Sequence, residues 1–272
     1  MGSRLERSVD HGVEGRAAAR GRVIVQQLIT LPTGAVSLHA VISLPDTPRA
    51  LVLIVHGCHP GVECPRDQVL AATLHEAGIA TVMADLLTPE EDHGERALGS
   101  FRYDVDLLSR RIGDVAGYIA TQPETRALPL GLMAGLEDAT SLVYAIARRP
   151  NAARAAVLID PYLHIAGPFL PALQMPTLLL VTRDDVHMLR YASQVVRSSP
   201  GKAELRVFHA PTPSPPVESA LGDHVARWFQ RHLTPASSVV ASGPRSVPSA
   251  PIPHPQETPH ARTSADHRTG PA

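Results

Sequence analysis

Imidazole and thiol side chains gather in one short stretch of the sequence. His56, Cys58, His59 and Cys64 fall within nine residues, and imidazole nitrogen with thiolate sulfur is a ligand set that zinc accepts. Their spacing matches no common zinc motif, so we expect no metal here. The chain holds two cysteines in all. Two cysteines cannot build a disulfide framework, so we expect free thiols, as in a reducing compartment.

A second feature is the segment GLMAG at 131–135. Small residues on both sides of a central residue are typical of the sharp turn that presents a nucleophile between a strand and a helix. The central residue here is Met133, whose thioether cannot form an acyl-enzyme. Ser141 lies more than a helical turn further along, where we expect a packing hydroxyl and not a nucleophile.

Acidic residues follow two of the predicted strands. Asp160 comes directly after an apolar run at 155–159, and Asp185 follows another at 177–182. Asp160 and His164 are candidates to line a pocket, although Asp160-Pro161 is equally typical of the start of a turn. Asp185 has a plain structural role open to it, because Asp is a preferred N-cap for the helix predicted at 186–198.

Length and charge narrow the functional class. The chain has 272 residues and a formal net charge of -1, so we expect one domain with tails and no field that would hold nucleic acid. Residues 1–20 carry charges of both signs and lack an apolar run of leader or membrane-span length. We therefore predict a cytoplasmic protein with no membrane contact.

Both ends of the chain differ in composition from the middle. Residues 1–20 show no apolar periodicity, and 234–272 are rich in Pro, Ser, Thr and His. Neither segment can bury enough apolar surface to offset the entropy of ordering, so we expect both to be disordered. The predicted folded domain is 21–233.

Apolar periodicity divides that domain into alternating strands and helices. Two strands separated by Pro-Thr-Gly predict an antiparallel hairpin at 23–31 and 36–44, after which buried strands alternate with amphipathic helices. The region 89–99 is predicted to be a charged loop. We expect further strands at 51–55, 79–86, 128–133, 155–159, 177–182 and 204–208, and helices at 65–77, 103–121, 136–148, 186–198 and 217–233.

This alternation predicts an α/β protein with a mostly parallel sheet and helices on both faces. An antiparallel hairpin ahead of the alternation favours the α/β-hydrolase fold over a dinucleotide-binding fold. The first parallel strand is not followed by Gly-x-Gly-x-x-Gly, so a nicotinamide cofactor lacks its usual motif.

Short strings spread over the whole predicted domain resemble the dienelactone-hydrolase-like group of α/β-hydrolases. Each string is weak alone, but their order and spacing together carry the resemblance. They are LVLIVHG (51–57), CPRDQ (64–68), EAGIAT (76–81), DLLTPE (85–90), QPET (122–125), LPLG (128–131), AGP (166–168), PTLLLV (176–181) and RWFQRHL (227–233).

The resemblance implies ester or lactone hydrolysis by a Ser or Cys nucleophile, a His base and an Asp, with no metal or organic cofactor. Matched to the family pattern, the nucleophile position holds Leu136 and the base position holds Thr212, neither of which can do that chemistry. The acid position keeps Asp185. The turn after strand 51–55, with His56, Gly57 and Cys58, matches the loop that lends a backbone amide to the substrate oxygen.

These residues leave three hypotheses open. The first is a catalytically degenerate hydrolase that binds a small-molecule ligand or a protein partner. The second is a working ester or lactone hydrolase with a relocated nucleophile, Cys58, served by His59 or His209. The third is a purely structural subunit without a ligand pocket. An inert Cys58 is favoured over a nucleophilic one, because a Cys58 nucleophile would attack the carbonyl from the same side as the oxyanion donors.

Overall fold

The computed structural model describes residues 16–19, 22–57, 64–99, 101–182, 185–199, 202–208 and 215–233. The predictions for Cys58, His59, His209 and Thr212 lie outside these ranges, as do those for most of 1–20 and for 234–272.

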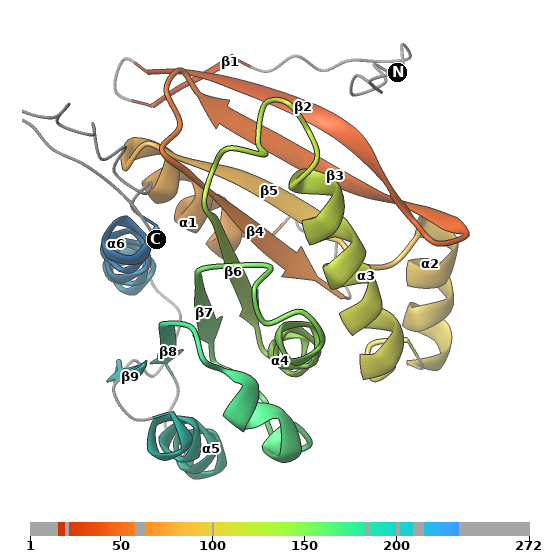
Figure 1. Cartoon of the computed structure of the whole chain (residues 1–272), viewed down its shortest axis with the longest axis vertical. Coiled ribbons are helices and arrows are strands. Elements are labelled where there is room, and N and C mark those ends of the chain that lie inside the picture. Colours follow the sequence, from red (N-terminus) through yellow and green to blue (C-terminus); the bar gives the residue numbers. More distant parts are fainter. Residues whose placement is uncertain are drawn as a thin grey trace, which may run out of the picture. The chain divides into compact units, whose positions relative to one another are not determined.

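Nine strands in the described ranges form one sheet in the order β1-β2-β3-β5-β4-β6-β7-β8-β9 (Figure 1). The first three strands pair antiparallel, β3 pairs antiparallel with β5, and every later pair is parallel. The strands are β1 (Arg16–Ala19), β2 (Arg22–Thr33), β3 (Val36–Pro45), β4 (Ala50–His56), β5 (Ile79–Asp85), β6 (Leu130–Gly135), β7 (Ala155–Ile159), β8 (Thr177–Val181) and β9 (Ala203–Val207).

Helices cover both faces of the sheet and create two apolar cores. One core packs α1 and α6 against the sheet, and the other packs α3, α4, the short 3-10 helix η2 and α5. Figure 1 shows α1 and α6 on one side and α3 and α4 on the other. The helices are α1 (Pro65–Glu76), α2 (Pro89–Leu98), α3 (Val105–Ile119), α4 (Asp138–Arg148), η2 (Gly167–Ala172), α5 (Val186–Ser198) and α6 (Pro215–His232).

Covering both faces explains the sequence pattern of the central strands. β4 is buried from Ala50 to Val55, and all five residues of β7 are buried. Such strands contain continuous apolar runs because neither face meets water. The α/β-hydrolase fold predicted from this pattern is confirmed, including the antiparallel hairpin of β2 and β3.

Three elements of the sheet and its helices differ from the sequence predictions, and the short helix η2 was not predicted either. The strand β1 lies inside the segment 1–20, because pairing with β2 uses backbone groups and needs no apolar side-chain pattern. Leu136 and Glu137 precede α4, whose predicted start is 136, since the turn after β6 occupies both residues. The third difference is α2.

The predicted charged loop 89–99 is wrong, because Pro89–Leu98 forms α2. Thr88 and Glu91 form a capping box, with the Glu91 amide bonding Thr88 Oγ1 at 3.2 Å and the Thr88 amide bonding Glu91 Oε2 at 2.9 Å. Pro89 stands in the first turn and Gly99 ends the helix in the left-handed conformation. These are ordinary signals for the start and end of a helix. The prediction of a loop relied on the charged composition of the segment instead.

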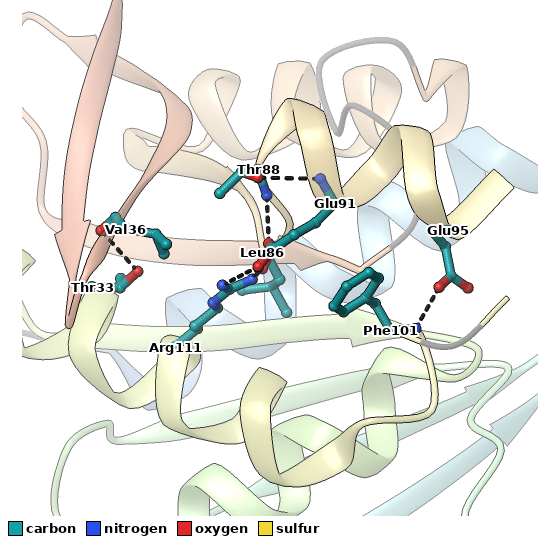
Figure 2. A network of polar contacts seen from close by, with 8 residues as sticks. All are labelled: Thr33, Val36, Leu86, Thr88, Glu91, Glu95, Phe101 and Arg111. Atoms are coloured by element: carbon teal, nitrogen blue, oxygen red, sulfur yellow. Dashed lines mark hydrogen bonds and ion pairs between the residues drawn. The ribbon is translucent and has the colours of Figure 1, made fainter. Parts of the chain in front are cut away.

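A buried arginine fixes α2 to α3 and to the end of β5 (Figure 2). Both terminal nitrogens of Arg111 donate to Glu91, at 2.6 and 2.7 Å, and Nη1 also donates to the Leu86 carbonyl at 2.7 Å. The hydrogen bonds from Arg111 lower the pKa of Glu91. Glu95 makes a second tie, accepting from the Phe101 amide at 2.5 Å and from Arg102 at 2.9 Å.

None of the helices in the described ranges has the length and apolar character needed to span a bilayer.

We expect Glu91→Gln to lower the free energy of unfolding by about 2 kcal/mol at neutral pH, because the Arg111 charge stays buried without its carboxylate. Because its folded-state pKa is lowered, Glu91 stabilises the fold at neutral pH. That stabilisation is lost as the pH falls through the lowered pKa, so wild type and variant should converge in acid. Urea unfolding at neutral and acid pH measures both effects. Glu90→Gln, in the same turn but exposed, is the matched control; an equal loss in both variants would contradict the assignment.

Candidate functional site

Leu136 occupies a strained turn between β6 and α4. Its φ is 50°, in the left-handed region that non-glycine residues avoid. Two hydrogen bonds to the chain after β7 hold it there: the Leu136 amide donates to Ile159 O at 3.0 Å, and the Tyr162 amide donates to Leu136 O at 3.0 Å. This is the strand-to-helix turn on which a nucleophile is presented in G-x-S-x-G proteins.

The other candidates for a nucleophile in this region do not lie at the turn. Met133 lies inside β6 and is 1% exposed. Ser141 lies in α4, fully buried, as expected of a packing residue. Leu136 is therefore the residue at the tip of the turn, and its side chain is half-buried.

The end of β4 lies beside the turn because β4 and β6 are parallel neighbours. Here Gly57 is so close to α4 that a Cβ on it would lie 2.3 Å from Asp138 Oδ1. The Gly57 backbone also hydrogen-bonds to the Asp138 carboxylate. Any larger residue at this position would displace the Asp138 carboxylate, and the Gly57 amide is engaged by that same side chain.

Asp138 is a buried carboxylate in the first turn of α4. Burial raises its pKa to about 6, although the hydrogen bond from Gly57 and the nearby charge of His56 act in the opposite direction. In the G-x-S-x-G pattern the second glycine stands two residues after the nucleophile. Asp138 takes that place, two residues after Leu136, and this spacing was the sequence signal that could have identified it.

His56 and Asp67 form a buried ion pair beneath this turn. His56 Nε2 lies 2.7 Å from Asp67 Oδ2, and the Asp67 side chain is 3% exposed. Burial opposes the charged imidazole, but Asp67 and the charges of Asp138 and Asp85 outweigh it and raise the pKa of His56. Burial likewise favours protonation of Asp67, but His56 and Arg66 lower its pKa overall. The pair is therefore stable in its charged form.

Arg66 brings a guanidinium to the turn itself. A Cβ on Gly135 would lie 2.9 Å from Arg66 Nη2, so the guanidinium lies directly against the backbone that leads into Leu136. Arg66 Nε also pairs with Asp67 Oδ1 at 3.4 Å. Cys64, just before α1, is half-buried, and burial with the neighbouring Asp67 charge raises the pKa of its thiol. Such a thiol is a poor nucleophile.

Two acidic residues after the neighbouring strands have structural roles. Asp185 caps α5, as predicted, by accepting from the amides of His187 at 2.8 Å and Met188 at 3.1 Å. Asp160, with φ 46°, accepts from the Thr182 amide at 2.6 Å and its hydroxyl at 2.5 Å. Asp160 therefore joins the ends of β7 and β8, which sequence reasoning did not foresee.

The sequence-predicted site residues are only partly brought together. His56, Gly57 and Leu136 lie at adjoining strand ends, and Asp185 follows β8 two strands away. His164 is exposed. Within the described ranges, no group of three or more His, Cys, Asp or Glu side chains is arranged to hold a metal ion. Arg66, Asp67 and Asp138 complete the cluster, and sequence reasoning did not identify them.

Two curated proteins are similar to this chain in sequence. No family model matches the chain. Two Mycobacterium tuberculosis proteins, from strains CDC 1551 / Oshkosh and ATCC 25618 / H37Rv and provisionally named phosphoribosyl transferases, are 31% identical to it over 208 residues. The match covers 75% of this chain but 46% of each relative, so the chain spans about half the length of these curated relatives.

Solved structures share the fold of this chain over about three quarters of its length. A dienelactone hydrolase from Anabaena variabilis superimposes with a TM-score of 0.73 at 25% identity, covering 77% of this chain and 99% of the other. The Est1E protein of Butyrivibrio proteoclasticus superimposes with a TM-score of 0.61 at 13% identity, covering 75% and 98%. The chain thus has the α/β-hydrolase fold, and it is similar in structure to a dienelactone hydrolase.

Proposed function

We propose that this protein is a catalytically degenerate α/β-hydrolase that binds a ligand or a protein partner at the carboxyl edge of its sheet. The observation that carries the proposal is Leu136 at the tip of the strand-to-helix turn, with its backbone in the left-handed conformation. A nucleophile at this place must supply a hydroxyl, thiol or carboxylate, and an isobutyl side chain supplies none.

The contact between Asp138 and Gly57 supports the proposal on electrostatic grounds. Acyl transfer depends on backbone amides that stabilise the negative oxygen of the transition state. The amide of Gly57 already donates to the Asp138 carboxylate. With a pKa of about 6, Asp138 is mostly ionised at neutral pH. A carboxylate at that amide repels the developing oxyanion instead of stabilising it.

A binding role is supported by exposed apolar side chains around the same edge. Ile165 follows β7 and is 46% exposed, and Val186 follows β8 and is 72% exposed. Tyr103, next to Arg102 whose charge acts on Asp138, is 63% exposed. Apolar side chains exposed at this edge lose their contact with water when a ligand or partner covers them, which favours binding.

The Mycobacterium tuberculosis relatives favour a protein partner. In each of them the matched segment makes up 46% of a longer protein provisionally named a phosphoribosyl transferase. In those relatives a hydrolase-like domain is joined to another segment within one protein. Where such a domain is a separate chain, it is suited to bind a partner protein instead. The alternative function, an ester or lactone hydrolase that uses Cys58, rests on a residue outside the described ranges.

The first test concerns the carboxylate of Asp138. Because burial raises its folded-state pKa to about 6, against 3.8 as the ordinary value, the folded state holds more protons than the unfolded state between about pH 4 and pH 6. Stability from this group therefore falls as the pH rises through that window. Asp138→Asn should match wild type near pH 4 and be more stable at pH 7.5, by up to about 3 kcal/mol.

Urea unfolding at the two pH values measures this difference. Asp46→Asn, which removes an exposed carboxylate, controls for the loss of one negative charge. A stability difference between Asp138→Asn and wild type that is the same at both pH values would show that Asp138 does not titrate in this window.

The second test asks for hydrolysis. We expect wild type to hydrolyse p-nitrophenyl acetate no faster than a heat-treated sample and to resist labelling by a fluorophosphonate probe, because loss of a triad nucleophile typically costs about a million-fold in rate. Leu136→Ser combined with Thr212→His should remain weak while Asp138 occupies the Gly57 amide. Adding Asp138→Gly should raise the rate above background.

The matched control carries Leu136→Ala with the same two partner changes and should stay inactive. The proposal is overturned by wild-type hydrolysis that disappears in Cys58→Ala, which would establish the relocated nucleophile.

A further inference from the structure

A cavity of about 310 Å³ lies between α3 and α4, at the end of α4 opposite the turn at Leu136. Its size is at the lower limit of small-molecule pockets. Three arginines line it: Arg110 from α3, and Arg148 and Arg149 from the end of α4. The remaining polar part of the lining comes from Ser109, Gly113 and Asp114.

The charges around this cavity do not balance. Asp106 is shared, because Arg110 and Arg148 each pair with one of its carboxylate oxygens. Arg149 pairs with Asp114, with Nη2 and Oδ1 3.3 Å apart. Among the described residues, three guanidinium groups thus face two carboxylates, which leaves one surplus positive charge at the cavity.

The arginines also keep hydrogen-bond donors for a ligand. Each guanidinium has five N–H donors. Among the described residues, the ion pairs of Arg110 and Arg148 engage a single nitrogen each. These donors lie at the surface, since the side chains of Arg110 and Arg148 are about half exposed. A ligand can therefore reach them without opening the protein.

Arg149 is held in place by the backbone of α3. Its Nη1 donates to the Gly113 carbonyl at 2.5 Å. A Cβ on Gly113 would lie 3.4 Å from Arg149 Cζ, at ordinary contact distance. A methyl group at Gly113 would therefore narrow the cavity while leaving Arg149 where it is. Fixing the guanidinium in advance reduces the entropy that a ligand must remove on binding.

We propose that this cavity binds a small phosphorylated anion, with its phosphate between Arg110, Arg148 and Arg149. A guanidinium group forms paired hydrogen bonds with two oxygens of a phosphate. Three converging arginines can share the several oxygens of a phosphate, whereas a carboxylate offers them only two. The cavity volume limits the remainder of the ligand to about the size of a sugar phosphate. The site is separate from the turn at Leu136 and does not depend on the function proposed there.

The test uses the full chain with inorganic phosphate and pyrophosphate as probes, measured by isothermal titration calorimetry at constant ionic strength. We expect pyrophosphate to bind more tightly than phosphate. Arg148→Gln and Arg149→Gln should each weaken pyrophosphate binding by about tenfold or more, as expected for loss of a charged hydrogen bond. Gly113→Ala, which also favours the helix, should keep phosphate binding and weaken binding of ribose 5-phosphate.

The matched control is Arg206→Gln on β9, which removes a similarly exposed arginine paired with Glu204. The proposal is overturned if pyrophosphate binding is absent, if it is unchanged in Arg148→Gln and Arg149→Gln, or if Arg206→Gln weakens it equally. If Arg149→Gln fails to fold by circular dichroism, Arg110→Gln, on the other helix, serves as the second variant with the same expected loss.

Discussion

The arrangement of the candidate site depends on one backbone constraint, the left-handed conformation of Leu136. A leucine at φ 50° costs about 1–2 kcal/mol relative to the right-handed region. Such strain persists only where the surroundings determine it, and here the carbonyl of Ile159 and the amide of Tyr162 do so. The sharp turn sets the direction in which α4 leaves the sheet. That direction brings Asp138 onto the amide of Gly57, so the strained geometry of the turn now positions a carboxylate.

The charged side chains around this turn are engaged by other groups of the same protein. His56 pairs with Asp67, Arg66 lies between Asp67 and the backbone of Gly135, and Asp138 accepts from Gly57. A buried charge that lacks a partner destabilises a protein strongly, whereas a paired and hydrogen-bonded one is tolerated. Catalysis of acyl transfer requires the opposite arrangement, with donors left open for a charge that appears only in the transition state. The two requirements cannot both be met at the Gly57 amide.

The sequence predicted the fold well because the central strands are covered on both faces. Short continuous apolar runs such as those of β4 and β7 are typical of strands buried in a parallel sheet. The helix α2 was missed because its capping signals, Thr88 with Glu91 and a terminal Gly99, lie among charged residues without an apolar stripe. The helix is also held by Arg111, 20 residues beyond Glu91 in the chain, and single-sequence periodicity contains no such contact. The ion pair of His56 with Asp67 was missed for the same reason, since only the fold brings β4 and α1 together.

The helix α4 connects the turn at Leu136 with the arginine-lined cavity, and its dipole acts differently at its two ends. The amino end favours negative charge, which partly offsets the burial of Asp138, and the carboxyl end favours the positive charges of Arg148 and Arg149. An anion placed at the carboxyl end meets the unfavourable pole of the helix, an effect of about 0.3–1 kcal/mol. Any attraction for a phosphate there must therefore come from the three guanidinium groups and not from the helix. Because those groups are about half exposed, that attraction is screened by salt.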